Sequence, residues 1–248
     1  LEKIELDEIR PSTRKYPYID FKPNKPSGKE ILSIKNISYK LGEKQVLNNV
    51  SFTVFKEDKI AFVGPDDIAK TTLFKILAGE IKPDSGEIMW GRAVDRAYYP
   101  KDNTAYFDTN ANILEWIQQY YNITDEQIMR GFLGRMLFSN DDVFKNVKVL
   151  SGGEKVRCML SKCMLEGPNL LIMDEPTNHL DLESITSLNK GLEKFNGEIL
   201  FSSFDHQFIQ TVANRIIEIG PKGMIDKSFT YDEYLESDAI QEKARAIY

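Results

Sequence analysis

The sequence LSGGE occupies residues 150–154, and LLIMDEPTNHLD follows at residues 170–181. In the first stretch, two adjacent glycines leave the backbone open, while the Ser151 hydroxyl and the start of the following helix offer hydrogen-bond donors to an anion. In the second stretch, an apolar strand delivers Asp174 at its carboxyl end, where a carboxylate can reach a magnesium ion held by a nucleotide. The adjacent Glu175 is placed to polarise an attacking water.

A third stretch, GPDDIAKTT at residues 64–72, follows a short apolar strand and precedes a predicted helix. The phosphate-binding loop has the pattern G-x-x-x-x-G-K-[ST], in which backbone N–H groups at a helix N-terminus cradle phosphates. Gly64, Lys70 and Thr71 fit this pattern, but Ala69 stands in place of its second glycine. Taken alone, the stretch is equally compatible with an ordinary strand–turn–helix; its position between a strand and a helix favours the phosphate loop.

Strands and helices alternate around these stretches, as in an α/β domain. Alternating β-branched and aromatic residues predict the strands, and apolar residues three and four apart predict the helices. We expect a parallel-core sheet, an antiparallel β layer built from residues 31–63 and a helical subdomain near residues 105–160. The predicted elements are strands over 31–34, 46–54, 59–63, 170–173 and 199–201, a helix over 71–78 capped by Gly79, and a helical insert over 112–144.

Composition and charge exclude several classes of protein. The 248 residues suit one large domain or two small ones, and no apolar run is long enough to span a bilayer. The first ten residues do not resemble a signal peptide, and because the first residue is not Met we expect a processed chain or a piece of a longer one. Cys158 and Cys163 are too few for a disulfide framework, which favours a reducing, cytoplasmic setting. The net charge of −6 argues against global attraction to nucleic acid but not against a local basic patch.

Residues 1–29 differ from the rest of the chain. They hold four of the ten prolines, and the segment from Arg10 to Lys29 contains six basic residues against Asp20 alone. Apolar residues within 1–9 are compatible with one face of a short helix that ends before Pro11. The remainder indicates an extended basic linker or, equally, a solvated tail.

Together, the LSGGE stretch and residues 174–181 resemble the nucleotide-binding domain of ATP-binding cassette (ABC) proteins, over residues 30–230. PTNHLD at 176–181 is more similar to the ABC-F subfamily than to transporter cassettes, and residues 1–20 are similar to the end of the inter-cassette linker in its YbiT-like branch. The resemblance implies an α/β P-loop NTPase fold of the ABC ATPase type, a C-terminal tail over 231–248, and hydrolysis of ATP with Mg²⁺. It also implies that the chain is the C-terminal cassette of a soluble, cytoplasmic protein and that its partner is the N-terminal cassette of the same protein. The implied target is the ribosome, through rRNA or tRNA, and no contact with a membrane is expected.

The family's roles carry over to the residues at matching positions. The resemblance implies that Glu175 is the catalytic base, that Thr71 and Asp174 bind Mg²⁺, and that Asp181 couples the two sites. Tyr39 matches the aromatic residue that stacks on adenine in the family. An ordinary tyrosine on the face of a strand is an equally good interpretation of this residue. The signature that would cover the γ-phosphate on the opposite cassette comprises Ser151, Gly152, Gly153 and Glu154. The implied nucleotide-binding residues are Tyr39, Gly64, Pro65, Asp66, Asp67, Ile68, Ala69, Lys70, Thr71, Thr72 and Lys101.

The sequence departs from the family pattern where the nucleotide is touched. Asp66, Asp67 and Ala69 replace the expected Asn, Gly and Gly of the loop, and Lys101 stands where the Q-loop glutamine is expected. Phe204 occupies the position of the switch histidine. We therefore expect a degenerate nucleotide site, and weak ATP hydrolysis by the isolated chain, beside an intact signature.

Two alternatives stay open. One is a cassette that binds no nucleotide itself and completes a partner's ATP site through its signature. The other is the ATPase subunit of an ABC transporter, which the basic linker and residues 176–181 disfavour.

Overall fold

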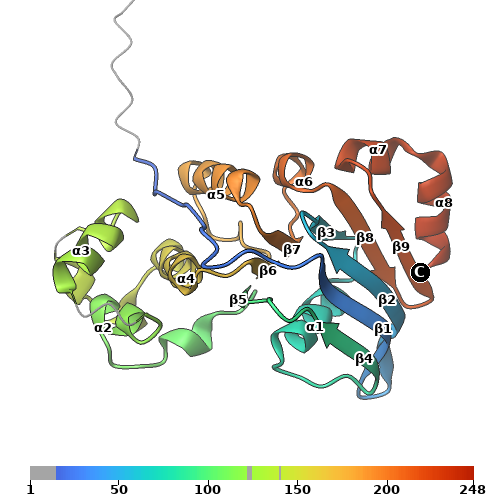
Figure 1. Cartoon of the computed structure of the whole chain (residues 1–248), viewed down its shortest axis with the longest axis horizontal. Helices are drawn as coiled ribbons and strands as arrows, with labels where there is room; N and C mark the ends of the chain where they lie inside the picture. The colour runs from blue at the N-terminus through green and yellow to red at the C-terminus, as the bar shows by residue number, and fades with distance from the viewer. Residues whose placement is uncertain (1–14, 122–124, 140) are drawn as a thin grey trace, which may run out of the picture.

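The computed structural model describes residues 15–121, 125–139 and 141–248. In these ranges, one sheet has the strand order β5–β6–β7–β3–β8–β9 and a smaller sheet the order β2–β1–β4 (Figure 1). The strands are β1 (Glu30–Leu41), β2 (Lys44–Phe55), β3 (Lys59–Val63), β4 (Ser85–Trp90), β5 (Arg96–Tyr99), β6 (Leu170–Asp174), β7 (Glu198–Ser202), β8 (Arg215–Gly220) and β9 (Gly223–Lys227).

The helices cover the larger sheet and build a separate subdomain, at the left of Figure 1. Short 3₁₀ turns η1 (Thr104–Phe107), η2 (Asp142–Phe144) and η3 (Val147–Val149) lie in that subdomain. The α-helices are α1 (Asp67–Ala78), α2 (Ile113–Gln118), α3 (Glu126–Arg135), α4 (Gly152–Glu166), α5 (Leu182–Lys194), α6 (His206–Val212), α7 (Tyr231–Glu236) and α8 (Asp238–Ala246).

The larger sheet separates two hydrophobic cores because successive side chains of a strand point to opposite faces. In β3, Ile60 and Phe62 join the core that holds α1 and the smaller sheet, whereas Ala61 and Val63 join the core beneath the other helices. The Phe62 and Phe74 rings meet edge to face at 5.2 Å, which fixes α1 against β3. The start of α1 therefore lies at the carboxyl end of a buried central strand.

The predicted parallel core and helical insert are confirmed, but the predicted antiparallel layer was wrong in part. Strands β5, β6, β7, β3 and β8 pair in parallel. Residues 59–63, which we assigned to the antiparallel layer, form β3 in the middle of the parallel sheet. The layer instead takes β4, which pairs with β1, as its third strand. The continuous apolar sequence of β3 fits a strand buried on both faces.

Residues 15–29, the N-terminal strap, form no helix or strand and pack against the cassette. Ile19 and Phe21 are buried, and the Phe21 ring meets Phe195 at 6.0 Å. The Tyr18 N–H donates to the Arg135 carbonyl at 2.9 Å, which ties the strap to α3 of the helical subdomain. This part of the predicted linker is extended but not a freely solvated tail; the short helical face predicted within residues 1–9 lies outside the described residues.

Residues 231–248, expected as a C-terminal tail, form α7 and α8 beside β8 and β9 (Figure 1). Tyr234 and Ile240 are buried, and the Lys222 N–H donates to the Ile247 carbonyl at 2.9 Å. The segment is thus an integral part of the cassette.

Candidate functional site

The predicted phosphate loop connects β3 to α1. Gly64 has φ of +98°, a conformation that favours glycine. Asp66 is the N-cap of α1, and its Oδ1 accepts the Ala69 N–H at 3.0 Å. A backbone donor at the helix start is therefore occupied by the chain's own carboxylate. Ala69 itself has no positive φ, so the loop is not strained where the glycine is missing.

The Asp67 carboxylate lies between two lysines. Its Oδ1 is 2.9 Å from Lys70 Nζ and its Oδ2 is 3.2 Å from Lys101 Nζ, while Lys70 Nζ also donates to the Gly64 carbonyl at 2.8 Å. Burial opposes ionisation of Asp67, but the two lysines outweigh it and hold the pKa of this carboxyl below its ordinary value. Lys70 of the predicted phosphate loop and Lys101 at the Q-loop position thus already share an internal counter-ion.

Phe204 covers the same two lysines. Lys70 Nζ lies 5.0 Å and Lys101 Nζ 6.0 Å from the centre of the Phe204 ring, and Phe204 as a residue is 65% exposed. The ring can shield the ammonium groups but offers no hydrogen bond to a γ-phosphate. His206 lies elsewhere, paired with Asp232 at 3.0 Å, so it does not take the switch role.

The carboxyl ends of β6 and β7 bring oxygen ligands to the loop. Thr71 Oγ1 donates to Asp174 Oδ2 at 2.7 Å, and Ser202 Oγ donates to Asp174 Oδ1 at 2.8 Å. Burial raises the pKa of Asp174 against the effect of these hydrogen bonds. Hydroxyl and carboxylate oxygens are ligands that Mg²⁺ accepts, usually together with substrate phosphates, so this pair fits the ion. Sequence reasoning missed Ser202, for which an apolar strand that ends in a serine is the only signal.

Glu175 is 2% exposed, and in the described part of the chain neither of its carboxylate oxygens has a hydrogen-bond partner. Its N–H donates to Ser202 Oγ at 3.0 Å, which fixes the backbone while the carboxylate stays free. Burial raises the pKa of Glu175 to about 7, although the nearby Lys70 and Lys101 lower it. A carboxylate with a pKa near the ambient pH is well matched to general-base catalysis.

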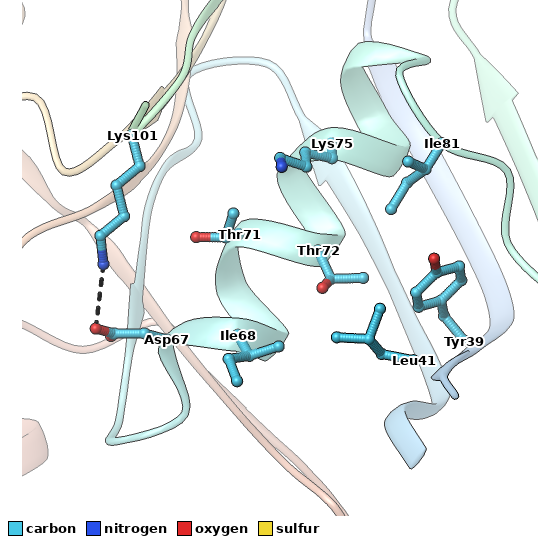
Figure 2. Close-up of a pocket in the computed structure, with 9 residues that line it drawn as sticks. All are labelled: Tyr39, Leu41, Asp67, Ile68, Thr71, Thr72, Lys75, Ile81 and Lys101. Carbon is cyan, nitrogen blue, oxygen red and sulfur yellow. Dashed lines mark hydrogen bonds and ion pairs between the residues drawn. The ribbon is translucent and has the colours of Figure 1, made fainter. Parts of the chain in front are cut away.

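A cavity of about 390 Å³ lies beside the phosphate loop, between α1 and the smaller sheet (Figure 2). It brings together predicted residues from three parts of the chain. Sequence reasoning missed Leu41, Lys75 and Ile81; the helical spacing from Ile68 through Thr71 to Lys75 could have indicated this lysine. Residues predicted from the sequence that line this cavity are Tyr39, Asp67, Ile68, Thr71, Thr72 and Lys101.

The signature forms the start of α4. Ser151 Oγ accepts the Glu154 N–H at 3.3 Å, and the Glu154 carboxylate accepts the Ser151 N–H at 2.8 Å, which completes a capping box. Ser151 and Gly152 are exposed, and a Cβ at Gly152 would lie 3.5 Å from His179. Asp181 caps α5 by accepting the Ser184 N–H at 2.8 Å. The structure therefore presents Ser151 and Gly152 of the signature to solvent, next to His179 of the segment that follows Glu175.

Comparisons with known proteins agree with this geometry. The family model described as "ABC transporter" matches residues 47–178. The chain is 54% identical to the uncharacterized ABC transporter ATP-binding protein YkpA of Bacillus subtilis, over 100% of this chain and 46% of that protein. It is 40% identical to YbiT of Escherichia coli O157:H7, named as a probable ATP-binding protein, over 97% of this chain and 46% of YbiT. It is 32% identical to ABC transporter F family member 5 of Arabidopsis thaliana, over 96% and 35%.

Solved structures show the same fold. The dimeric ATP-binding cassette MJ0796, described as a post-hydrolysis state bound to ADP and Pi, matches with a TM-score of 0.66 at 19% identity, over 80% of this chain and 98% of that one. This chain spans about half the length of the curated relatives it matches. In the described ranges, none of the helices has the length and apolar character needed to traverse a membrane. The chain belongs to the ABC ATPase family, and its relatives fit a nucleotide-binding domain of the ABC-F type.

Proposed function

We propose that this chain is one cassette of a two-cassette ABC-F protein, in which its signature completes the ATP site of the partner cassette while its own site binds ATP with Mg²⁺ weakly. One observation carries the proposal of a weak site: the Asp67 carboxylate pairs with both Lys70 and Lys101. The capping box and the exposure of Ser151 support the role of the signature. The chain covers only about half the length of these relatives, which supports a second cassette in the same protein.

The electrostatics of the loop support a weak site. A carboxylate about 4 Å from a phosphate charge costs roughly 4 kcal/mol at an effective dielectric constant near 20, and Mg²⁺ and salt reduce this cost. A bound phosphate must also displace Asp67 from two lysines. Replacing Asp66, Asp67 and Ala69 with the family's Asn, Gly and Gly tests this part of the proposal, because ATP affinity should then rise.

Any hydrolysis at this site would use residues that are already in place. Thr71 and Asp174 would hold Mg²⁺, which neutralises phosphate charge. Glu175 would take a proton from the attacking water, since its carboxylate is free and its pKa is about 7. Phe204 supplies no polar group to the γ-phosphate, and the loss of one such group typically costs about a hundredfold in rate.

The same contacts favour a second candidate, a cassette that takes no nucleotide and acts only through its signature. Both lysines and the Ala69 N–H in the first turn of α1 already have partners within the chain. Equilibrium binding of ATP with Mg²⁺ separates the two: saturable binding in the millimolar range supports a weak site, and no binding at any concentration supports the second candidate.

We further propose, on the ABC-F relationship, that the protein acts in the cytoplasm on the ribosome, with the basic N-terminal segment touching RNA. Lys22 and Lys25 pair with Asp20 and Asp95, whereas Lys15 and Lys29 are exposed and absent from the ion pairs of the described residues. Deleting the segment would uncover buried strap residues, so changing charges is the sharper test.

Changing Arg10, Arg14, Lys15 and Lys29 to Gln should weaken pelleting of this chain with ribosomes. If all four contact phosphates, the slope of log affinity against log salt should fall by roughly three. The matched control changes four exposed lysines on or next to the smaller sheet to Gln and should leave binding unchanged; these are Lys35, Lys40, Lys44 and Lys56. Equal salt slopes for the two variants would assign the RNA contact elsewhere.

A further inference from the structure

Two side chains from the C-terminal part of the chain contact the rear of the phosphate loop. A Cβ added at Gly64 would lie 2.6 Å from the Tyr248 hydroxyl and 2.7 Å from Glu218 Oε1, so both groups already fill the space behind this glycine. Neither residue lines the nucleotide cavity. Tyr248 and Glu218 therefore contact the phosphate loop itself and do not line the cavity beside it.

The fold brings these groups to the loop from separate elements. Glu218 lies on β8, where it is in register with Val63, the residue before Gly64. Tyr234 on α7 donates a hydrogen bond to Glu218 Oε2, and both residues are buried. Tyr248, which follows α8, donates to the Ile219 carbonyl at 3.1 Å. The helices α7 and α8 therefore serve to aim Tyr248 at β8 and the loop.

Further contacts hold the loop at this point. The Tyr248 hydroxyl interacts with the Asp66 backbone, and burial together with the Glu218 carboxylate raises the pKa of this hydroxyl, which keeps it protonated. In addition, Lys70 Nζ donates to the Gly64 carbonyl at 2.8 Å. Residues 64–66 belong to no helix or strand. These side-chain contacts therefore add to the backbone hydrogen bonds that the Pro65 and Asp66 carbonyls accept from Asp67 and Lys70.

We propose that Tyr248 is a positioning residue for the phosphate loop and that Glu218 holds it in place, so that residues 231–248 set how well the loop is ordered for phosphate. The part of this inference that concerns phosphate rests on the proposed function. Ordering matters because a cradle of backbone N–H groups binds an anion well only when they already converge on it.

Hydrogen exchange of the nucleotide-free chain tests the ordering directly. Tyr248→Phe removes one hydroxyl and leaves the ring, so the amides of Gly64 and of residues 66–69 should exchange roughly three- to tenfold faster, the effect of losing about one hydrogen bond. Amides of β6 and β7 should not change. The matched control Tyr120→Phe removes a half-buried hydroxyl in the helical subdomain and should leave the loop unaffected.

Unchanged exchange in the loop overturns the proposal, and so does equal acceleration of all slow amides, which would mean a purely global effect on stability. Glu218→Gln should act through the same contact, so the double variant should exchange no faster than the more affected single variant. Effects that add would show that Glu218 does not act through Tyr248.

A second readout connects the loop to nucleotide. In the chain whose loop is restored to the family pattern by Asp66→Asn, Asp67→Gly and Ala69→Gly, adding Tyr248→Phe should weaken ATP binding roughly three- to tenfold, again the effect of about one hydrogen bond. Equal affinity with and without Tyr248→Phe contradicts the role in phosphate binding. If the restored loop binds no ATP at all, the proposed function fails while the exchange experiment still decides the positioning role.

Discussion

The triple variant Asp66→Asn, Asp67→Gly, Ala69→Gly should bind ATP with Mg²⁺ at least about a hundredfold more tightly than the natural chain. Two carboxylates leave the phosphate site, and each would cost roughly 4 kcal/mol at about 4 Å before screening. A residual gain of only about 2.7 kcal/mol corresponds to a hundredfold. Removing Asp67 also frees Lys70 and Lys101 for phosphate. Isothermal titration with ATP and Mg²⁺ measures the change.

The substitutions preserve the start of α1, since Asn caps a helix as well as Asp. The two new glycines should lower the free energy of unfolding by up to about 1 kcal/mol each, which urea unfolding checks. A matched control, Asp108→Asn with Asp141→Asn, removes two exposed acidic charges from the helical subdomain and should not alter affinity. Equal affinities of the natural chain and the triple variant would show that the acidic residues do not weaken the site.

In the full-length two-cassette protein, Ser151→Arg should lower steady-state ATP hydrolysis at least about tenfold. Ser151 is exposed at the start of α4, where the signature would face the nucleotide on the other cassette. A guanidinium group there fills the space meant for that nucleotide and removes the serine. Phosphate release under saturating ATP measures the loss.

The substitution also removes a helix cap, which costs about 1 kcal/mol of stability. Asn112→Arg is the matched control, because it destroys the equivalent capping box of α2 away from the signature. Hydrolysis by the Ser151→Arg protein within twofold of the natural rate, with the control equally active, would remove the signature from catalysis.

Much of the fold could be predicted because local patterns agreed with each other. The stretch at residues 150–154 predicts a following helix near Lys155, and the apolar run ending at Asp174 predicts a central strand. The structure has both, although α4 already begins at Gly152. Strand β3 shows where local patterns fail. A buried strand of five residues does not reveal its partners, which lie more than 130 residues away on β7 and β8.

The candidate site was predictable as a set of residues but not as a set of contacts. Motif spacing marks Asp67 and Lys101, yet their pairing joins residues 34 positions apart and depends on the close approach of α1 to the end of β5. The contact of Tyr248 with Gly64 spans almost the whole cassette. No motif marks it, because a tyrosine that supports a loop from behind has no fixed spacing from that loop.

The site on residues 64–72 is expected to contribute little to hydrolysis. Glu175→Gln in the full-length protein tests it most directly, because this substitution removes the base of this site and leaves the signature that serves the other site unchanged. Glu175 has no hydrogen-bond partner for its carboxylate in the described residues, so Gln should fit without loss of structure. Steady-state phosphate release within about twofold of the natural protein is the predicted result. Loss of most of the activity would show instead that the loop tolerates its acidic residues and that this site carries most of the hydrolysis.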